Sequence, residues 1–484
     1  MSIVLHRRQF CIARFRYEFG PDWRCLDLPD GFILSYQTDL SIQRIRNGTG
    51  ETTILGRCFS SVPQSMERCD LAGRFAILNW PYVQTDAAGL MSLYYGGDAL
   101  RPFVTSSPAL AAHLAEADHL PIELKWKIGL NWIPTPGSRV AGVARLMRDQ
   151  MLEIPHLAVE FFPRDVIPSA SVEQAAHILS SGLIHVLRQV EESHGKVYLA
   201  LTAGLDSRTL FGALLAADVK FEAITQRFPG VDPGDLRIPA DLCRYAGIPH
   251  KVVRMDKPDE RAMAALRIHT ADSSEGADGI YLIPGNSYGF LEKDTALVRG
   301  GCFEVGRRFY RRRLGELELA GATGEQLLSK FGSEAKGDMA GFLDQWLAWR
   351  RSHRDGLDLT DSFYLDQRLG GWLSALEQGL DVLAGNSVQP VNCERFFAAL
   401  MAPEAEERYT GSLQHDIIRG FDKNLLKFPV NPVSFGTKMR AMARKSKRQL
   451  QSAMQRVLQS ALCMIGLRLS VREDTLLETA TLLA

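Results

Sequence analysis

The segment TAGLDS, residues 202–207, separates two apolar runs and combines residue types suited to phosphate binding. Gly204 leaves the backbone open to close approach, and Thr202 and Ser207 supply hydroxyl donors to phosphate oxygens. Asp206 repels phosphate directly, so the chemistry that fits is a divalent cation between its carboxylate and the phosphates. The segment predicts a nucleotide-phosphate loop with a metal carboxylate. An ordinary strand-to-helix turn, in which Asp206 only caps the helix, is the alternative.

The elements around this loop are expected to place it at the edge of a parallel sheet. Residues 196–201, 221–226, 250–255 and 295–300 are short runs typical of strands, and helical patterns follow the first two of them. Alternating strands and helices are typical of a parallel sheet with crossovers. A helix that begins directly after such a strand presents unpaired N–H groups and a positive dipole end, which together hold anions.

The first 120 residues are instead predicted to be mostly β and sandwich-like, because short apolar and aromatic runs alternate with Gly, Asp, Asn and Pro. These runs are residues 31–37, 52–56, 73–80 and 91–95. Helical spacing of apolar residues predicts a helix over 171–195, with Ser171 able to cap it. From about Leu359 the chain is predicted to be helical, and it ends in a basic amphipathic helix at 437–457.

The length and composition of the chain are those of an ordinary globular protein. The 484 residues favour two domains or more, and 56 basic against 56 acidic residues give no global charge that would attract nucleic acid or a membrane. No two of the eight cysteines have CxxC spacing, so we interpret them as reduced thiols. The start of the chain is too short and too charged for a secretory leader, and no apolar run approaches a membrane span. We therefore expect a cytoplasmic protein.

The loop resembles a known phosphate-binding loop. TAGLDS is similar to the S-G-G-x-D-S loop of ATP pyrophosphatases, with Thr202 and Ala203 in place of Ser and the first Gly. Longer segments resemble the asparagine synthetase family in the same order along the chain, from Ala72 to about Pro432. These segments are LAGRFAILNW, TDAAGLMSLYY, FVTSSPALAAH, the linker GSRVAGVARLMRDQMLEI, FEAITQRFPGVDPGDLRIPADLCRYAGIPHKVV and QPVNCERFFAALMAP.

The resemblance implies an α/β protein with two domains and a tail. Residues 1–160 would form an Ntn-hydrolase-like αββα sandwich of the glutamine amidotransferase kind. Residues 165–440 would form a parallel-sheet domain like the adenine nucleotide α-hydrolases, also called a PP-loop domain, with a helical C-terminal part. Residues 441–484 would form a basic helical segment.

The resemblance also implies a reaction and a set of site residues. Enzymes of this kind transfer AMP from ATP to a carboxylate, release pyrophosphate and let an amine attack the acyl-adenylate, with Mg²⁺ as cofactor. Asp206 and Glu304 would bind the metal, and Glu304, Tyr310 and Lys427 would act in catalysis, with Lys423 as the reserve lysine. The residues expected near the nucleotide are Thr202, Ala203, Gly204, Asp206, Ser207, Thr225, Asp235 and Gly300.

The sequence departs from the family pattern in two places. In RGGCFEVGRRFY the family's second metal carboxylate is replaced by Phe303, and Glu304 follows it. An arginine cluster comes next and is expected either to meet anions or to be solvated; it comprises Arg307, Arg308, Arg311, Arg312 and Arg313. At the N-terminus Ser2 stands where glutamine-dependent members have a cysteine nucleophile, and Cys11 would serve only after an unusual cleavage. RNGTGE, residues 46–51, is predicted to be a hairpin turn rather than a glutamine-binding strand.

We therefore expect a synthetase that takes its nitrogen from an amine other than glutamine-derived ammonia, as β-lactam synthetases and lasso-peptide cyclases do. Its substrate would be a small molecule or peptide carrying a carboxylate and an amine. The alternatives are a non-catalytic scaffold with a decayed site, a glutamine-dependent synthetase, and a nucleic-acid modifier supported only by the basic C-terminal helix. Arg208, directly after Asp206 and Ser207, is also unlike the common Ser or Ala of the family.

Overall fold

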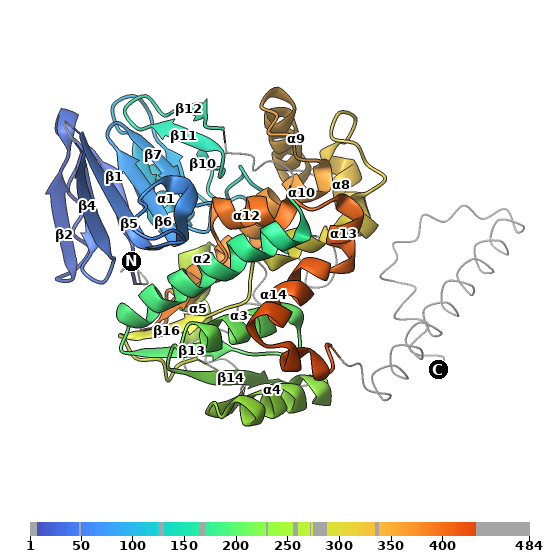
Figure 1. Ribbon diagram of the computed structural model, residues 1–484. Helices are drawn as coiled ribbons and strands as arrows, with labels where there is room; N and C mark the ends of the chain where they lie inside the picture. The colour runs from blue at the N-terminus through green and yellow to red at the C-terminus, as the bar shows by residue number, and fades with distance from the viewer. Residues whose placement is uncertain are drawn as a thin grey trace, which may run out of the picture. The chain divides into compact units, whose positions relative to one another are not determined.

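The computed structural model (Figure 1) describes residues 7–47, 50–122, 124, 130–163, 170–228, 231–254, 260–271, 273, 288–333 and 338–431. The chain divides into two compact units, residues 1–231 with 235–431, and residues 232–234 with 432–484. Ser2 and the predicted basic helix lie outside the described residues. Within the described part, no helix has both the length and the apolar character needed to cross a membrane.

The N-terminal part is a sandwich of two six-stranded antiparallel sheets. The first sheet has the order β10 (Val143–Arg145), β8 (Tyr94–Gly96), β9 (Phe103–Thr105), β1 (Phe10–Ala13), β3 (Ile33–Gln37) and β2 (Trp23–Asp27). The second sheet has the order β12 (Ala158–Phe161), β11 (Gln150–Glu153), β7 (Tyr82–Thr85), β6 (Leu71–Asn79), β5 (Gly50–Ser60) and β4 (Ile42–Asn47). The two-sheet arrangement confirms the predicted β-rich sandwich.

Alternating residues of both sheets form the core between them, which includes Ile12, Leu34, Leu55 and Val104. Within the described part of residues 7–163, α1 (Pro108–Ala115) is the single α-helix. Ser107 caps it by accepting a hydrogen bond from the Leu110 amide at 3.3 Å. The helical layer of the predicted αββα sandwich consists here of one short helix, α1, beside the first sheet.

The helix at the other side of the sandwich comes from the next part of the chain. Helix α2 (Val172–Glu192) packs against the end of β5, where the Gln189 amide bonds both backbone groups of Ser60 at 3.0 and 2.7 Å. Ser171 and Gln174 form a capping box at its start, as the sequence pattern predicts. In Figure 1 α2 runs beside α12 (Glu394–Met401) and α14 (Ser412–Asp422), and both pairs are in contact.

The second part of the chain is built on a five-stranded sheet in which every strand pair is parallel. Its order is β15 (His250–Arg254), β14 (Phe221–Arg227), β13 (Lys196–Ala200), β16 (Thr295–Val298) and β17 (Asn386–Val388). The connections after β13 and β14 are α3 (Leu205–Ala216) and α4 (Pro233–Ala246). Strand order reverses between β13 and β16, so their carboxyl ends diverge into a crevice at that point.

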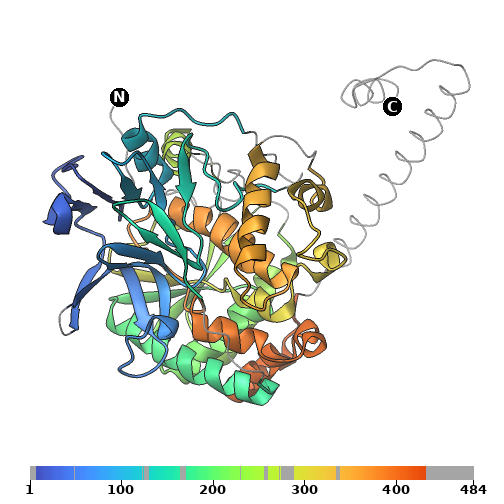
Figure 2. The ribbon, with the colours of Figure 1, turned by 90° about the horizontal axis from the view of Figure 1, so that it is seen from above.

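Helices cover this sheet and connect it to the sandwich. They are α5 (Glu260–Thr270), α7 (Arg311–Leu314), α8 (Gly324–Lys330), α9 (Asp338–Ser352), α10 (Leu359–Phe363), α11 (Ser374–Leu380), α13 (Ala405–Thr410) and the 3₁₀ segments η3 (Phe303–Arg307) and η5 (Lys423–Lys427). Residues Tyr364–Leu373, η4, form a π-helix between α10 and α11. In both views the orange helices of this part adjoin the blue and teal strands of the sandwich (Figures 1 and 2).

Candidate functional site

The loops after β13 and β16 meet at the reversal point of the parallel sheet. A Cβ added to Gly300 would lie 3.0 Å from the Ser207 amide nitrogen and 3.2 Å from the Asp206 carbonyl carbon. The approach of the two loops therefore needs glycine at position 300. A pocket of about 560 Å³ opens at this place. Its wall includes residues that follow or end four strands of the sheet: Thr202, Gln226, Gly300 and Gln389.

Hydroxyl groups close the 202–207 loop on itself. The Thr202 amide donates to Ser207 Oγ at 3.0 Å, and the Gly204 amide donates to Thr202 Oγ1 at 3.2 Å. Gly204 is the N-cap of α3, and no side chain caps the helix. The first-turn N–H groups of α3 therefore have no side-chain cap, as expected for an anion-binding helix start, and the Ser207 amide lies close to Gly300. Asp206 does not act as the helix cap, so the capping role that the alternative interpretation gave it is wrong.

Asp206 is held by an arginine and a glutamine. Arg307 approaches it with both terminal nitrogens, Nη1 to Oδ1 at 2.5 Å and Nη2 to Oδ2 at 3.1 Å. Gln414 on α14 donates to the same Oδ1 at 2.7 Å, and Gln414 Oε1 accepts from Arg307. Although burial lowers the pKa of the Arg307 guanidinium, the Asp206 carboxylate raises it above its ordinary value overall. The pair is thus a fixed ion pair with bidentate geometry.

This arrangement does not fit a Mg²⁺ ion at Asp206. Mg²⁺ takes oxygen ligands at about 2.0–2.1 Å in octahedral geometry, whereas Asp206 Oδ1 already accepts two N–H groups, Oδ2 accepts one, and the adjacent Arg307 charge would repel a divalent cation. Within the described chain, one group of three His, Cys, Asp or Glu residues has ligand atoms close enough to share an ion. That group is Glu67, Cys69 and Asp70, and none of the three lines this pocket.

Glu304 lies in the same pocket as Asp206, as the sequence predicts. Tyr364 donates to its Oε2 at 3.4 Å. Burial and, second, the Asp206 carboxylate raise the pKa of Glu304 above its ordinary value of 4.5. A carboxyl group with a raised pKa in a pocket is a frequent property of functional sites.

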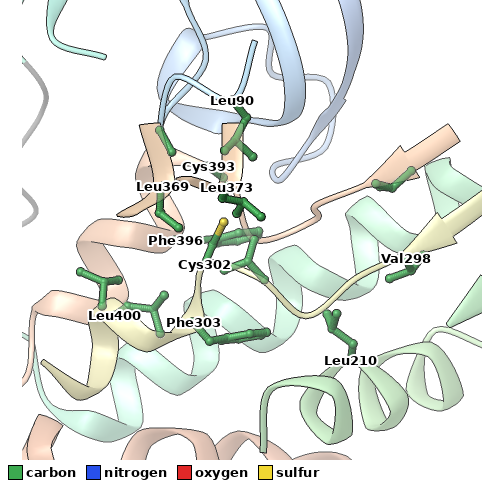
Figure 3. Packing of buried hydrophobic residues seen from close by; sticks show 14 of the residues in the cluster. Leu90, Leu210, Val298, Cys302, Phe303, Leu369, Leu373, Cys393, Phe396 and Leu400 are labelled. Carbon is green, nitrogen blue, oxygen red and sulfur yellow. The ribbon is translucent and has the colours of Figure 1, made fainter. Parts of the chain in front are cut away.

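Phe303, directly before Glu304, belongs to the hydrophobic core, whereas Cys302 lies between the core and the pocket wall. Phe303 is fully buried and lies in one apolar cluster with Leu210 and Leu400, and Cys302 lies near Leu373 and Phe396 (Figure 3). Cys302 also has a left-handed backbone conformation, with φ of 75°. The turn therefore anchors Phe303 in the hydrophobic core and presents Glu304 and Arg307 to the pocket.

The π-helix Tyr364–Leu373 supplies much of the remaining wall, including Arg368 and Trp372. The Arg368 guanidinium lies 3.5 Å from the Trp372 ring centroid. Arg368 forms no close ion pair with a carboxylate of the described chain, and it interacts electrostatically with Glu304 in the same pocket. π-helical turns occur frequently at functional sites, and no periodicity in the sequence had indicated this one.

A buried polar network supports the loop after β16. Glu377 accepts from Arg299 Nη1 at 2.6 Å and from Gln389 Nε2 at 2.9 Å. Gln389 Oε1 in turn accepts from the Gly301 amide at 3.1 Å. Glu377 on α11 thus holds Arg299, in the loop after β16, and Gln389, which directly follows β17. No motif in the sequence marks Glu377, Gln389 or Arg299 as site residues.

The structure does not bring the other predicted site residues to the pocket. Tyr310 is buried in an aromatic cluster with Phe309 and Phe363, and burial raises its pKa to about 12. Lys427 and Lys423 are exposed at the ends of η5. None of these three residues is among the described residues that line the pocket.

Three residues expected near the nucleotide also lie outside the pocket wall: Ala203, Thr225 and Asp235. Ala203 is buried under the loop. Thr225 donates to the Leu201 carbonyl at 2.9 Å and lies 2.8 Å from His250 Nε2, so it joins β13 to β14 rather than facing a ligand. Asp235 is in the first turn of α4. Thr202, Gly204, Asp206, Ser207, Gly300 and Glu304 do line the pocket.

Arg208 has a structural role that explains its departure from the family pattern. It is fully buried and donates to the carbonyls of Ala203 at 3.2 Å, Leu425 at 3.1 Å, Phe428 at 2.7 Å and Pro429 at 2.7 Å. Burial lowers its pKa to about 10. Arg208 therefore ties the start of α3 to residues 425–429.

Of the five clustered arginines, Arg307 lines the pocket and the other four do not. The others contact acceptors or rings elsewhere: Arg308 pairs with Asp358, Arg311 with Glu406, Arg312 with the Tyr409 hydroxyl, and Arg313 lies over Phe331. The cluster is thus mostly a set of local contacts, with one member directed to the site.

The surroundings of Cys11 do not suit a nucleophile for glutamine hydrolysis. Cys11 is fully buried in β1, and burial raises its pKa to about 12. The seven described cysteines are free thiols, as expected. Strands β4 and β5 pair as a hairpin with Asn47 opposite Gly50, which confirms the predicted turn at 46–51.

Comparisons with known proteins add little to this description. No protein-family model matches the chain, and no curated protein matches it significantly. A solved structure of glutamine phosphoribosylpyrophosphate (PRPP) amidotransferase from B. subtilis, complexed with ADP and GMP, is similar to it at 11% identity. The match covers 63% of this chain and 72% of that chain, with a TM-score of 0.19. A likeness of this size carries no argument about fold or function.

Proposed function

We propose that the chain is an ATP-dependent synthetase that forms an amide or lactam and releases AMP and pyrophosphate. One observation carries the proposal. The loops after β13 and β16 meet where strand order reverses, around an open pocket that contains Asp206, Glu304 and Arg307. In parallel sheets with this strand order, ligands bind in the crevice at the reversal point. The uncapped start of α3 at the same place supports an anionic ligand.

The proposed reaction has two steps. A carboxylate oxygen of the acid substrate attacks the α-phosphorus of ATP, the bond to the bridging oxygen breaks, and pyrophosphate leaves. An amine then attacks the acyl carbon, the bond to the AMP oxygen breaks, and the amine proton goes to a base. The reaction needs positive charge around the phosphates and a group that accepts a proton.

The residues of the pocket are suited to these needs. Arg307, Arg368 and the first-turn N–H groups of α3 would stabilise the phosphates and the leaving pyrophosphate. Glu304, whose pKa is raised, would accept the amine proton. Asp206 would orient Arg307. The expected Mg²⁺ does not fit the side chains described, so no step is assigned to it.

The same proposal covers the two parts of the chain. We interpret residues 165–440 as a PP-loop synthetase domain and residues 1–160 as a glutamine amidotransferase-like sandwich without glutaminase activity. The burial of Cys11 supports this, because a thiol with no access to solvent cannot serve as the nucleophile. The amine is then expected to come from the substrate itself, a small molecule or a peptide.

The test is pyrophosphate release by the purified chain with ATP and a panel of carboxylic acids, with mass spectrometry to detect the acyl-adenylate. Asp206→Ala frees Arg307 from its orienting carboxylate and is expected to lower the rate about 100-fold. Asp27→Ala is the matched control, because Asp27 is exposed in a surface pair with Arg16. Pyrophosphate release that Asp206→Ala leaves unchanged would refute the proposal.

A non-catalytic scaffold is the second candidate, and the buried Phe303 favours it. This residue stands where the resembling family has a metal carboxylate, and here it belongs to the hydrophobic core. A scaffold with a decayed site is expected to show no nucleotide binding by calorimetry, whereas the synthetase binds ATP.

A further inference from the structure

Arg307 neutralises the Asp206 carboxylate, which is the electrostatic role expected of a metal ion at this residue. Its two hydrogen bonds use the terminal fork of the guanidinium, Nη1 and Nη2. The second Nη1 hydrogen faces Gln414 Oε1. Among the described residues, nothing accepts from Nε or from the second hydrogen of Nη2. Arg307 therefore keeps a second, lateral fork with two donors, and its side chain lines the pocket.

Packing around Arg307 fixes this orientation. Phe303, at the other end of the same 3₁₀ segment, is fully buried in the core (Figure 3). Arg408 donates to the Val305 carbonyl at 2.7 Å, which holds the middle of the segment. On the opposite side Gln414, which is 2% exposed, keeps the Asp206 carboxylate in place. The guanidinium is thus preorganised on both sides before any ligand arrives.

A second guanidinium faces the same space. Arg368 lies over the Trp372 ring, 3.5 Å from its centroid, and forms no close ion pair in the described chain, although it interacts electrostatically with Glu304. Arg299 also lines the pocket, but Glu377 compensates its charge at 2.6 Å. Planar guanidinium forks match the geometry of phosphate oxygens and bind them through two parallel hydrogen bonds.

We propose that Arg307 takes the place of the divalent cation, so that this pocket binds a polyphosphate through arginine forks without a metal ion. The lateral fork of Arg307, the guanidinium of Arg368 and the open N–H groups of α3 form the binding surface. The identity of the ligand as the triphosphate of ATP rests on the proposed function. The binding of the polyphosphate group itself does not, because it depends only on the geometry of these donors.

The test measures binding of inorganic pyrophosphate and of ATP to the full chain by calorimetry, once in EDTA and once in excess MgCl₂. For the wild-type chain we expect dissociation constants for pyrophosphate that differ by less than about threefold between the two conditions. Arg307→Gln is expected to weaken binding in EDTA at least about tenfold, since it removes a charged, bidentate contact. Arg312→Gln is the matched control, because Arg312 is exposed and contacts Tyr409 outside the pocket.

Each outcome decides between the two proposals. Pyrophosphate binding that requires Mg²⁺ would overturn the arginine site and leave the nucleotide function standing. Metal-free binding of pyrophosphate without binding of ATP would uphold the arginine site and overturn the proposed synthetase. If neither ligand binds under either condition, both proposals fall. Should Arg307→Gln not fold, Arg307→Lys keeps the charge without the fork and is expected to bind more weakly than the wild type in EDTA.

Discussion

At the scale of one residue, the pocket disfavours the charged form of the Glu304 carboxyl group. Burial and the neighbouring Asp206 carboxylate raise its pKa above 4.5. A carboxyl group whose pKa is higher in the folded chain binds its proton more tightly there than in the unfolded chain. Its contribution to stability is fully present below pH 4.5 and is lost as the pH rises through the folded-state pKa.

We therefore expect Glu304→Gln, which cannot ionise, to have a higher free energy of unfolding than the wild type at pH 7. The difference should shrink as the pH falls toward 4.5, because the wild-type carboxyl then becomes neutral as well. Urea denaturation at several pH values measures it. Glu318→Gln, at an exposed position, is the control and should show no such difference. A Glu304→Gln chain that is less stable than the wild type at pH 7 would contradict this account.

Gly300 determines, at the scale of the elements, how closely the two loops of the site approach. A Cβ at this position meets backbone atoms of Ser207 and Asp206 at 3.0 and 3.2 Å, and backbone cannot rotate away as a side chain can. Gly300→Ala is expected to displace the start of α3, to destabilise the fold by about 1–3 kcal/mol and to weaken pyrophosphate binding. Thermal denaturation and calorimetry measure the two effects.

The control for this substitution is Gly341→Ala in α9. A Cβ at Gly341 meets no atom within 4 Å, so alanine there is expected to stabilise the helix slightly. If Gly300→Ala binds pyrophosphate as the wild type does, the contact between the loops does not shape the site.

Elements with a strong local pattern could be predicted from the sequence. The strands β13, β14, β15 and β16 and the helix α2 were all expected within a few residues of their observed bounds, because apolar spacing and caps are local properties. The strand β17 was not expected, since its three residues, Asn386–Val388, carry no run of apolar residues. The π-helix was not predicted, because its period differs from both the period of an α-helix and the period of a β-strand.

The site itself could be predicted only where it is continuous in sequence. The loop 202–207, Gly300 and Glu304 were found from short motifs, and they do share one pocket. Arg368, Trp372 and Glu377 were not, because only tertiary packing brings residues so distant in sequence to the loop. The structure places Lys427 at an exposed helix end and Tyr310 in a buried aromatic cluster, and position in a resemblance does not reveal such surroundings.

At the scale of the whole molecule, buried polar contacts join the sandwich to the helices of the second part, both within the first compact unit. Arg74 on β6 contacts both oxygens of Asp381 at 2.8 and 2.9 Å, and Arg148 contacts Asp366 at 2.7 Å. Asn392 donates to the buried Asp86 carboxylate in the sandwich at 2.8 Å. Since each pair would leave a buried charge without its partner if the two parts separated, we expect them to unfold together.

This expectation can be tested at Asp381, whose side chain is 5% exposed. Asp381→Ala removes the carboxylate that pairs directly with the buried Arg74 guanidinium and is expected to lower the free energy of unfolding by about 3–5 kcal/mol. Native-state hydrogen exchange should report the same loss at amides of β6 and of α11, because both sides of the contact depend on it. Asp241→Ala, which removes a surface pair with Arg244, should change stability by less than about 1 kcal/mol. Loss of protection confined to α11, with β6 unaffected, would mean that the sandwich is stable without the helices that carry the pocket.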